Sequence, residues 1–435
     1  MGLGNERQLL EGNLMRDDPT AQRSLSVIKW LTFFMFMMFA MTTDSVGVII
    51  PQVIKEFHLS MTVGGAFHYA AMSGIAFAGF FLGYLADKLG RKRTIILGLV
   101  LFALNSYLFA LGRSFAFFLI LLVISGAAIG IFKTGALALI GDISRSTTEH
   151  TATMNTVEGF FAVGAIIGPA IVARLLAVGT SWKWLYVIAG TICVVLIMVA
   201  SLVRYPHTSA AAESVDLKRT LRMMANPYAL GFSGVIFLYV AVESAIYVWM
   251  PTLLVSYKGS FVWIATYAIS IFFVLRAAGR FVGSWMLARL NWAAVVTVLS
   301  FAMLACFVIS MLGGVTCAVF VLPLSGLFMS VLYPTLNSKG ISCFRKSEHG
   351  AVAGVILFFT CASAVIGPLS MAAVSDHFSA PKYGFILATG FAGLLFVALL
   401  LNWILNPTRE ILSRLDVSEY SATDAEAVLG MKMTN

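Results

Sequence analysis

Charge is scarce in this chain. Of its 435 residues only 11% are Asp, Glu, Lys or Arg, whereas 60% are hydrophobic. A soluble domain carries about a quarter charged residues, because polar groups must cover its surface. A water-soluble fold of this composition could not cover its own surface. The sequence therefore indicates a protein that lies within a membrane.

Several chemical signatures are missing as well. The five cysteines lie in or beside apolar segments and form no C-x-x-C pair, which argues against a disulfide framework or a zinc site. The sequence has no metal-ligand spacing, no nucleotide-binding glycine loop and no nucleophile elbow. We therefore expect no enzyme activity, no metal and no cofactor. The net charge of +9 would suggest a nucleic-acid partner in a soluble protein, but here its placement has another cause.

Long apolar runs make up most of the chain. A membrane-spanning helix needs roughly 20 predominantly apolar residues. We therefore predict an all-α membrane protein with twelve transmembrane helices in two six-helix bundles. The predicted spans are residues 27–50, 64–86, 94–112, 115–141, 153–177, 184–204, 228–256, 262–286, 291–313, 315–338, 350–375 and 382–405.

The longest polar interruption, residues 205–227, divides these spans into two sets of six. Lys and Arg gather in the linker, the tails and alternate loops, which predicts that both termini are cytoplasmic. The positive net charge then reflects topology and contact with anionic lipid. We expect the protein to lie in a bacterial inner membrane and to be a monomer. The predicted parts are an N-terminal tail (1–26), a first bundle (27–204), a linker (205–227), a second bundle (228–405) and a C-terminal tail (406–435).

The densest group of charges lies between two spans, where the chain reads G-Y-L-A-D-K-L-G-R-K-R. This spacing resembles the loop between helices 2 and 3 of the major facilitator superfamily of secondary transporters. The resemblance implies a small-molecule substrate and a gating role for this motif. A fainter copy, G-R-F-V-G, ends the eighth span. The candidate gating residues are Gly83, Asp87, Gly90, Arg91, Lys92 and Arg280.

Ionisable residues inside the spans are the main functional candidates, because a charge in the membrane interior must be paired or face water. Asp44, near the outer end of the first span, is either a proton- or substrate-binding carboxylate or a residue of the membrane interface. Lys133, in the fourth span, either binds an anionic substrate group or pairs with a carboxylate such as Asp44 or Glu158. Glu158 shares a helix face with Asn155 at the start of the fifth span.

A second group of candidates lies in the second half of the chain. Glu243 is in the middle of the seventh span, with Tyr239 one turn before it, Tyr247 one turn after it and Trp249 nearby. This arrangement can bind sugar hydroxyls while the rings stack on the apolar face of the sugar. Alternatively, Glu243 locks its helix to a neighbour. Arg276, in the eighth span, can reach either a cavity or a carboxylate.

Four longer sequence runs resemble one particular family within this superfamily. Residues 155–169, 237–244, 325–341 and 347–368 are similar to the corresponding helices of the fucose–proton symporter family, and the third run adds Asn337 as a candidate substrate ligand. The resemblance implies import of a sugar together with a proton by alternating access. Asp44 matches that family's first-helix carboxylate, and Glu158 lies where the family has a sugar-binding amide. Lys133 falls close to a carboxylate of the family, and if it faces the cavity, this departure favours a sugar acid or another carboxylate-bearing solute over a neutral sugar.

A second transport class remains open. The run G-A-I-I-G-P in the fifth span also resembles a motif of proton-coupled drug exporters, although Ala170 and Ile171 replace the glycine pair that follows the proline there. The alternative function is thus a proton-antiport exporter of drugs or other small metabolites. A third class, a receptor or scaffold that transports nothing, is disfavoured, because such a protein would not need charged residues inside its membrane spans.

Overall fold

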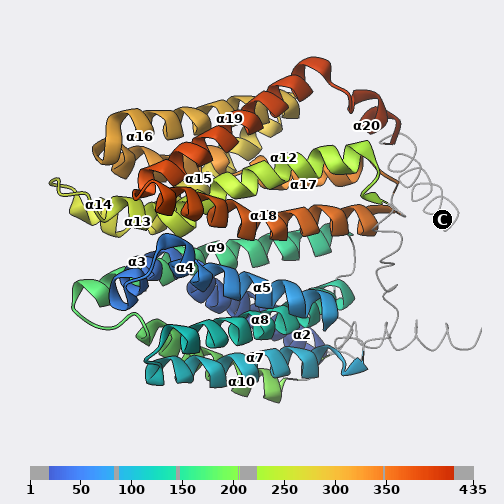
Figure 1. Cartoon of the computed structure of the whole chain (residues 1–435). Coiled ribbons are helices and arrows are strands. Elements are labelled where there is room, and N and C mark those ends of the chain that lie inside the picture. The colour runs from blue at the N-terminus through green and yellow to red at the C-terminus, as the bar shows by residue number, and fades with distance from the viewer. Residues whose placement is uncertain are drawn as a thin grey trace, which may run out of the picture. The chain divides into compact units, whose positions relative to one another are not determined.

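The structure, a computed structural model, describes residues 19–82, 88–143, 147–203, 205, 223–345 and 348–415. In these ranges all regular structure is helical (Figure 1). The chain forms two compact units. Unit 1 consists of Met1–Ile49 and Ala66–Ala212, and unit 2 consists of Ile50–Gly65 and Glu213–Asn435. The boundary at residue 212 falls inside the segment predicted to be a linker.

The expected all-α membrane fold is confirmed. Ten helical stretches of the described residues are long and apolar enough to cross a membrane. One of them, Trp292–Ser342, contains two of the twelve predicted spans, and its helix breaks at Gly314, where φ is 66°. That break lies between the spans predicted at 291–313 and 315–338. The predicted second span is represented by Ala66–Phe81, which has 16 residues; residues 83–87, at the end of the predicted span, lie outside the described ranges.

The described residues of unit 1 contain six long helical stretches that match the first six predicted spans. The first packs against the fifth, the second against the fourth, and the third against the sixth. Small residues allow the closest of these approaches. A Cβ on Gly164 or Gly168 of the fifth helix would collide with main-chain carbonyl oxygens of the first helix. The helices of this unit are α2 (Pro19–Thr43), the start of α3 (Val46–Phe57), α5 (Ala66–Phe81), α7 (Arg91–Leu108), α8 (Phe115–Ile143), α9 (Thr147–Ala177) and α10 (Trp184–Leu202).

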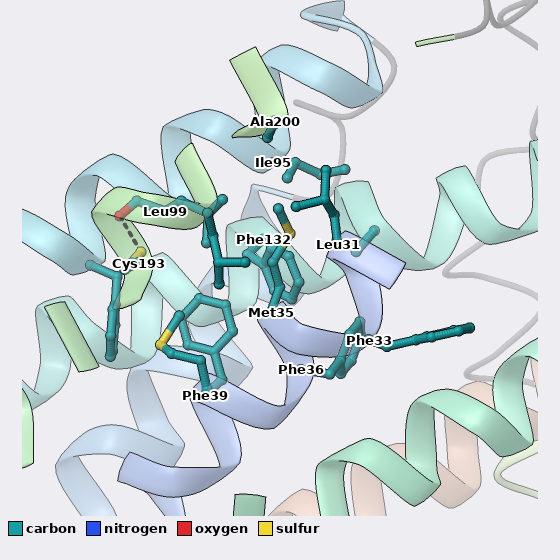
Figure 2. Close-up of a cluster of buried hydrophobic side chains, with 14 of the residues drawn as sticks. Leu31, Phe33, Met35, Phe36, Phe39, Ile95, Leu99, Phe132, Cys193 and Ala200 are labelled. Carbon is teal, nitrogen blue, oxygen red and sulfur yellow. Dashed lines mark hydrogen bonds between the residues drawn. The ribbon is translucent and has the colours of Figure 1, made fainter. Parts of the chain in front are cut away.

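The core of unit 1 is aromatic and aliphatic. Figure 2 shows Phe36 and Phe39 of α2 beside Phe132 of α8, and the ring centroid of Phe39 lies 4.7 Å from that of Phe132. Leu99 of α7 completes the contact, and its carbonyl accepts a 3.2 Å hydrogen bond from the thiol of Cys193 on α10. The cysteine therefore packs as a small apolar residue with a weak donor.

Unit 2 repeats the helix pairing of unit 1. Its first helix packs against its fifth, its second against its fourth, and its third against its sixth. The close contacts repeat as well: Gly126 faces the carbonyl of Ala71 in unit 1, and Gly326 faces that of Phe272 in unit 2. The helices are α12 (Pro227–Ser244), α13 (Met250–Leu254), α14 (Val262–Thr266), α15 (Ala268–Leu287), α16 (Trp292–Met329), α17 (Leu332–Ser342), α18 (His349–His377), α19 (Pro381–Leu405) and α20 (Arg409–Leu415).

The segment Ile50–Gly65 belongs to unit 2 although both of its ends continue into unit 1. It contains the end of α3 and the short helix α4 (Met61–Gly64). The carboxylate of Asp376, at the end of α18, accepts the backbone N–H groups of Met61 at 2.8 Å and Thr62 at 2.7 Å. These donors would otherwise have no partner at the start of a helix. Asp376 thus fixes α4 to unit 2.

Candidate functional site

The first helix of unit 2 is interrupted in its middle. The α-helical turns of α12 end at Ser244, and a π-helical turn follows over Ala245–Trp249 before α13 begins. Single π-helical turns inside α-helices are frequent at functional sites. Interrupted helices also mark the substrate and ion sites of many secondary transporters. Glu243 lies directly before this interruption.

Glu243 is buried and forms an ion pair with Arg276 of α15, from its Oε1 to the arginine Nη1. The side chains are 11% and 16% exposed respectively. Arg280 lies one turn further along α15, close enough for its charge to act on the same region. Of the two sequence interpretations of Glu243, the structure shows the one in which it links its helix to a neighbour. The pair is not fully covered.

The aromatic residues around Glu243 hold helices together in this structure. The hydroxyl of Tyr239 donates a 3.0 Å hydrogen bond to the carbonyl of Met329, and the indole N–H of Trp249 donates one of 2.9 Å to the carbonyl of Pro368. Both side chains are buried. Tyr247 is only half-buried, and its hydroxyl lies 3.2 Å from the hydroxyl of Ser244. Tyr247 is therefore the most accessible of the three predicted aromatic ligands.

A second interrupted helix meets α12 at this place. The helix that follows Gly314 is broken after Met329, and α17 starts at Leu332. Pro334 contributes to the break because it has no N–H to donate to the carbonyl of Ser330. The ring of Tyr333 lies 6.2 Å from that of Tyr239. Asn337, the predicted ligand on this helix, is half-buried one turn further on.

Unit 1 has its own interrupted first helix, and its helical stretch is longer than the predicted span. The predicted span ends at residue 50, but the structure continues the helical stretch through α3 to Phe57, with Pro51 inside it. Asp44 lies in the turn between α2 and α3, more than three turns before Phe57. It is half-buried, and its Oδ2 accepts a 2.9 Å hydrogen bond from the hydroxyl of Thr43.

Asp44 and Glu243 occupy matching positions in the two units. Each is followed by a serine and then by a proline in the next helix, which is Pro51 in α3 and Pro251 in α13. The spacing is seven residues in the first case and eight in the second. The π-helical turn accounts for the difference, because its hydrogen bonds close one residue later than those of an α-helix. The pattern D-S…P against E-S…P could have revealed this equivalence in the sequence.

The other candidates of unit 1 lie on α8 and α9. Lys133 is half-buried on α8, with its Nζ 5.4 Å from the ring centroid of Phe161 on α9, within the range of a cation–π contact. Glu158, three residues before Phe161, is exposed on the surface of the structure. The backbone of Asn155 is helical, and its side chain lies outside the described part of the chain. Whether Lys133 binds an anion or a carboxylate of the protein stays a prediction.

The gating motif is described in part. Gly83 and Asp87 lie outside the described residues. Gly90 has a φ of 79°, which favours glycine, and leads into α7. Arg91 is buried, and the ammonium of Lys92 donates to the carbonyls of Ser201 at 2.9 Å and Val203 at 2.8 Å, at the end of α10.

The matching motif in unit 2 lies within α15 rather than in a loop, seven residues before that helix ends. Arg280 is half-buried there, and the flanking Gly279 and Gly283 pack against the residues around the break in the fourth helix of the unit. Among the described residues, no group of three or more His, Cys, Asp or Glu side chains is placed to hold a metal ion.

Known proteins match this chain in sequence and in fold. Quinolone resistance protein NorA of Staphylococcus aureus is 37% identical over 91 residues, which cover 21% of this chain and 23% of NorA. The match thus spans less than a quarter of that relative. The crystal structure of the Escherichia coli fucose:proton symporter FucP has a TM-score of 0.61 at 21% identity, over 87% of this chain and 99% of FucP. The nucleoside transporter NupG has a TM-score of 0.70 at 15% identity, over 87% and 99%.

At these identities the two solved structures show the fold. The model of the Major Facilitator Superfamily matches residues 32–368, which include the interrupted helices of both units and the described part of the charged motif. The expectation of a transporter rather than an enzyme is confirmed. This chain is a multi-pass membrane transporter of small molecules and belongs to the major facilitator superfamily.

Proposed function

We propose that this protein imports a sugar or a sugar acid together with a proton, by alternating access. The observation that carries the proposal is the ion pair between Glu243 and Arg276 at the interrupted middle of α12. A carboxylate that is paired inside a membrane span can take up a proton only if its partner finds another anion or water. Proton binding and substrate binding can therefore depend on each other at this place.

The fold is compatible with this choice, because the structural match to FucP, a fucose:proton symporter, extends over nearly the whole FucP chain. Candidate contacts for a sugar are the hydroxyl of Tyr247 and the amide of Asn337, both half-buried in unit 2. Asp44, Lys133 and Glu158 are the candidates in unit 1. Asp44, Glu158 and Glu243 are the candidates for proton coupling.

The test uses purified protein in vesicles. An acidic exterior should drive accumulation of a sugar or sugar acid, and a proton-conducting uncoupler should abolish it. The amide variant of the coupling carboxylate should lose accumulation and keep exchange of labelled for unlabelled substrate. If Asp44→Asn, Glu158→Gln and Glu243→Gln each still accumulate substrate against a gradient, proton coupling through these residues is wrong.

The second candidate function is proton-driven export of drugs or metabolites. It is favoured by the local similarity to NorA, a quinolone resistance protein. The run G-A-I-I-G-P is weaker evidence for export, because its two glycines, Gly164 and Gly168, allow the close packing of α9 against α2. Export predicts that expression raises resistance to a toxic compound, whereas import predicts growth on a sole carbon source.

We further propose that the protein is a monomer of the bacterial inner membrane with both termini in the cytoplasm. The support is the excess of Lys and Arg in the tails, the linker and the loop that contains Lys92. A reporter fused after residue 435 that is active only in the cytoplasm tests the orientation. Activity of a reporter that works only outside the cytoplasm would contradict it.

A further inference from the structure

The π-helical turn that follows α12 leaves a nearby hydroxyl without a hydrogen bond. Several helical threonines of this protein bond to the carbonyl four residues earlier, as Thr297 does to Ala293 at 2.7 Å and Thr360 does to Ile356 at 2.9 Å. The hydroxyl oxygen of Thr252, three residues after the turn, is buried and has no hydrogen-bond partner. A buried polar group without a partner is unfavourable. The turn therefore persists because other contacts stabilise it.

Helix α18 contacts α12 directly before and directly after this turn. Before the turn, the two backbones touch, because a Cβ on Gly367 would lie only 2.8 Å from the Cα of Ala241. Glu243, next to the turn, is held by its ion pair with α15. At the last residue of the turn, the buried indole of Trp249 donates its 2.9 Å hydrogen bond to the carbonyl of Pro368. Two neighbouring residues of α18 thus fix the two sides of the turn.

The turn determines the direction of every side chain that follows it. A π-helical turn contains one residue more than an α-helical turn, because its hydrogen bonds close one residue later. Each residue of an α-helix rotates the chain by about 100°. If the same residues formed a regular α-helix, Trp249 would point about 100° away from its present direction. It could not reach Pro368 while Ala241 stayed against Gly367, so this hydrogen bond exists only in the π-helical form.

We infer that Trp249 is a positioning residue, whose hydrogen bond to α18 selects the π-helical form and thereby sets the directions of Tyr247 and of α13. Tyr247 lies inside the turn, half-buried, with its hydroxyl 3.2 Å from that of Ser244. Its part in transport rests on the function proposed above, in which Tyr247 is a candidate contact for the solute. A change to the regular form would rotate this ring and move its hydroxyl away from the place where it meets the solute.

Unit 1 differs from unit 2 at both of these features. The fifth helix of each unit contains a glycine–proline pair, at residues 168–169 and 367–368. Ile49, which has no donor in its side chain, lies two residues before Pro51, whereas in unit 2 the residue two before the matching proline is Trp249. The described helices α2 and α3 contain no π-helical turn. The extra residue and the indole donor thus occur together in unit 2 and are both missing from the matching stretch of unit 1.

The two forms of the helix expose different residues of α13. In the regular form, each residue after the turn takes the direction that the next residue has now. Leu254 is buried and would take the exposed direction of Val255. Thr252 is half-buried and would take the buried direction of Leu253. A change of form therefore uncovers one position and covers another, whereas a general loosening of α13 would uncover both.

The first experiment measures alkylation of single cysteines by N-ethylmaleimide in the full-length protein, with its five native cysteines replaced by alanine. Trp249→Phe keeps an aromatic ring and removes the N–H donor. It should raise the labelling rate of Leu254→Cys about twofold to tenfold, the shift in equilibrium expected for the loss of one hydrogen bond. The rate of Thr252→Cys should not rise. Val255→Cys, at an exposed position, gives the reference rate.

The second experiment deletes Ala245, the first residue of the turn. With one residue fewer, a regular α-helix places Glu243 and Trp249 in their present directions, so the form of the helix no longer depends on the indole. In this background Trp249→Phe should leave the labelling of Leu254→Cys unchanged. Deletion of Gly234, in the regular part of α12, is the matched control. It should destabilise the protein in SDS much more than deletion of Ala245, because it turns packed residues out of place.

Three outcomes would overturn the inference. These are equal increases in labelling at positions 252 and 254, no increase at position 254, and the same increase with and without Ala245. If the deletion variant does not fold, the comparison of Leu254→Cys with Thr252→Cys in the chain of full length still decides. None of these measurements needs a substrate or a proton gradient, so a failure here leaves the proposed symport untouched, and a failure of symport in vesicles leaves this inference untouched.

Discussion

The ion pair between Glu243 and Arg276 should dominate the local stability of unit 2, and a double-mutant cycle can measure this. Each single amide variant, Glu243→Gln or Arg276→Gln, leaves the other charge buried without its partner. Breaking a buried pair in this way costs about 3–5 kcal/mol. Because the two side chains retain 11% and 16% of their exposure, water can reach the remaining charge, and we expect the lower end, about 3 kcal/mol.

The double variant should recover most of that loss, because two amides carry no charge and can bond to each other. We therefore expect an interaction energy of roughly 3 kcal/mol between the two positions, measured from SDS-induced unfolding in mixed micelles. Arg289→Gln is the matched control. Arg289 is exposed beyond the end of α15, with its guanidinium 4.6 Å from the ring of Trp285, so its effect should add to that of Glu243→Gln. A double variant as unstable as the sum of the two singles would refute the pairing.

Three further predictions concern positions outside the pair. Asp376→Asn should lower the free energy of unfolding by about 1.5–3 kcal/mol, because an amide cannot accept both N–H groups of α4. The control is Glu56→Gln, at an exposed position on the same segment, and an equal loss of stability in the two variants would contradict the prediction. Gly168→Ala should cost about 1–3 kcal/mol through overlap with α2, while Gly159→Ala on the same helix, which has open space, should be neutral or stabilising in the same assay. Burial raises the pKa of the Cys343 thiol to about 11. The rate of its alkylation by N-ethylmaleimide in the folded protein, followed by mass spectrometry, should therefore increase with pH until about pH 11. Rapid labelling at pH 8 would contradict this prediction.

Features that depend on local composition could be predicted from the sequence. The apolar runs gave the helices, and the gap in them at residue 314 coincides with the break at Gly314. The free-energy cost of a charge in a membrane span identifies Glu243 and Arg276 as candidates from the sequence. Their pairing could not be predicted, because hydropathy reports that a residue is buried and does not report which helix it faces. The choice of partner depends on packing between segments distant in the chain.

Two local features depend on tertiary contacts that the sequence pattern does not report. The apolar run predicts a first span that ends at about residue 50. Helix α3 nevertheless continues to Phe57, because a proline in a helix removes one hydrogen bond without ending it when neighbouring structure supports the turn. The sequence leaves open whether Tyr239 and Trp249 contact a sugar or hold helices together. In the structure both use their polar atoms to satisfy carbonyls of neighbouring helices.

The way the chain supplies Ile50–Gly65 to unit 2 has a consequence for biosynthesis. Met61 is made early, whereas its partner Asp376 is made 315 residues later. During translation the first N–H groups of α4 cannot bind the Asp376 carboxylate until the eleventh predicted span has been made and inserted. A polypeptide that begins in the linker would contain Asp376 and lack α4 altogether. Unit 2 is therefore completed only by the full chain, and a truncated or split gene product would lack one of its parts.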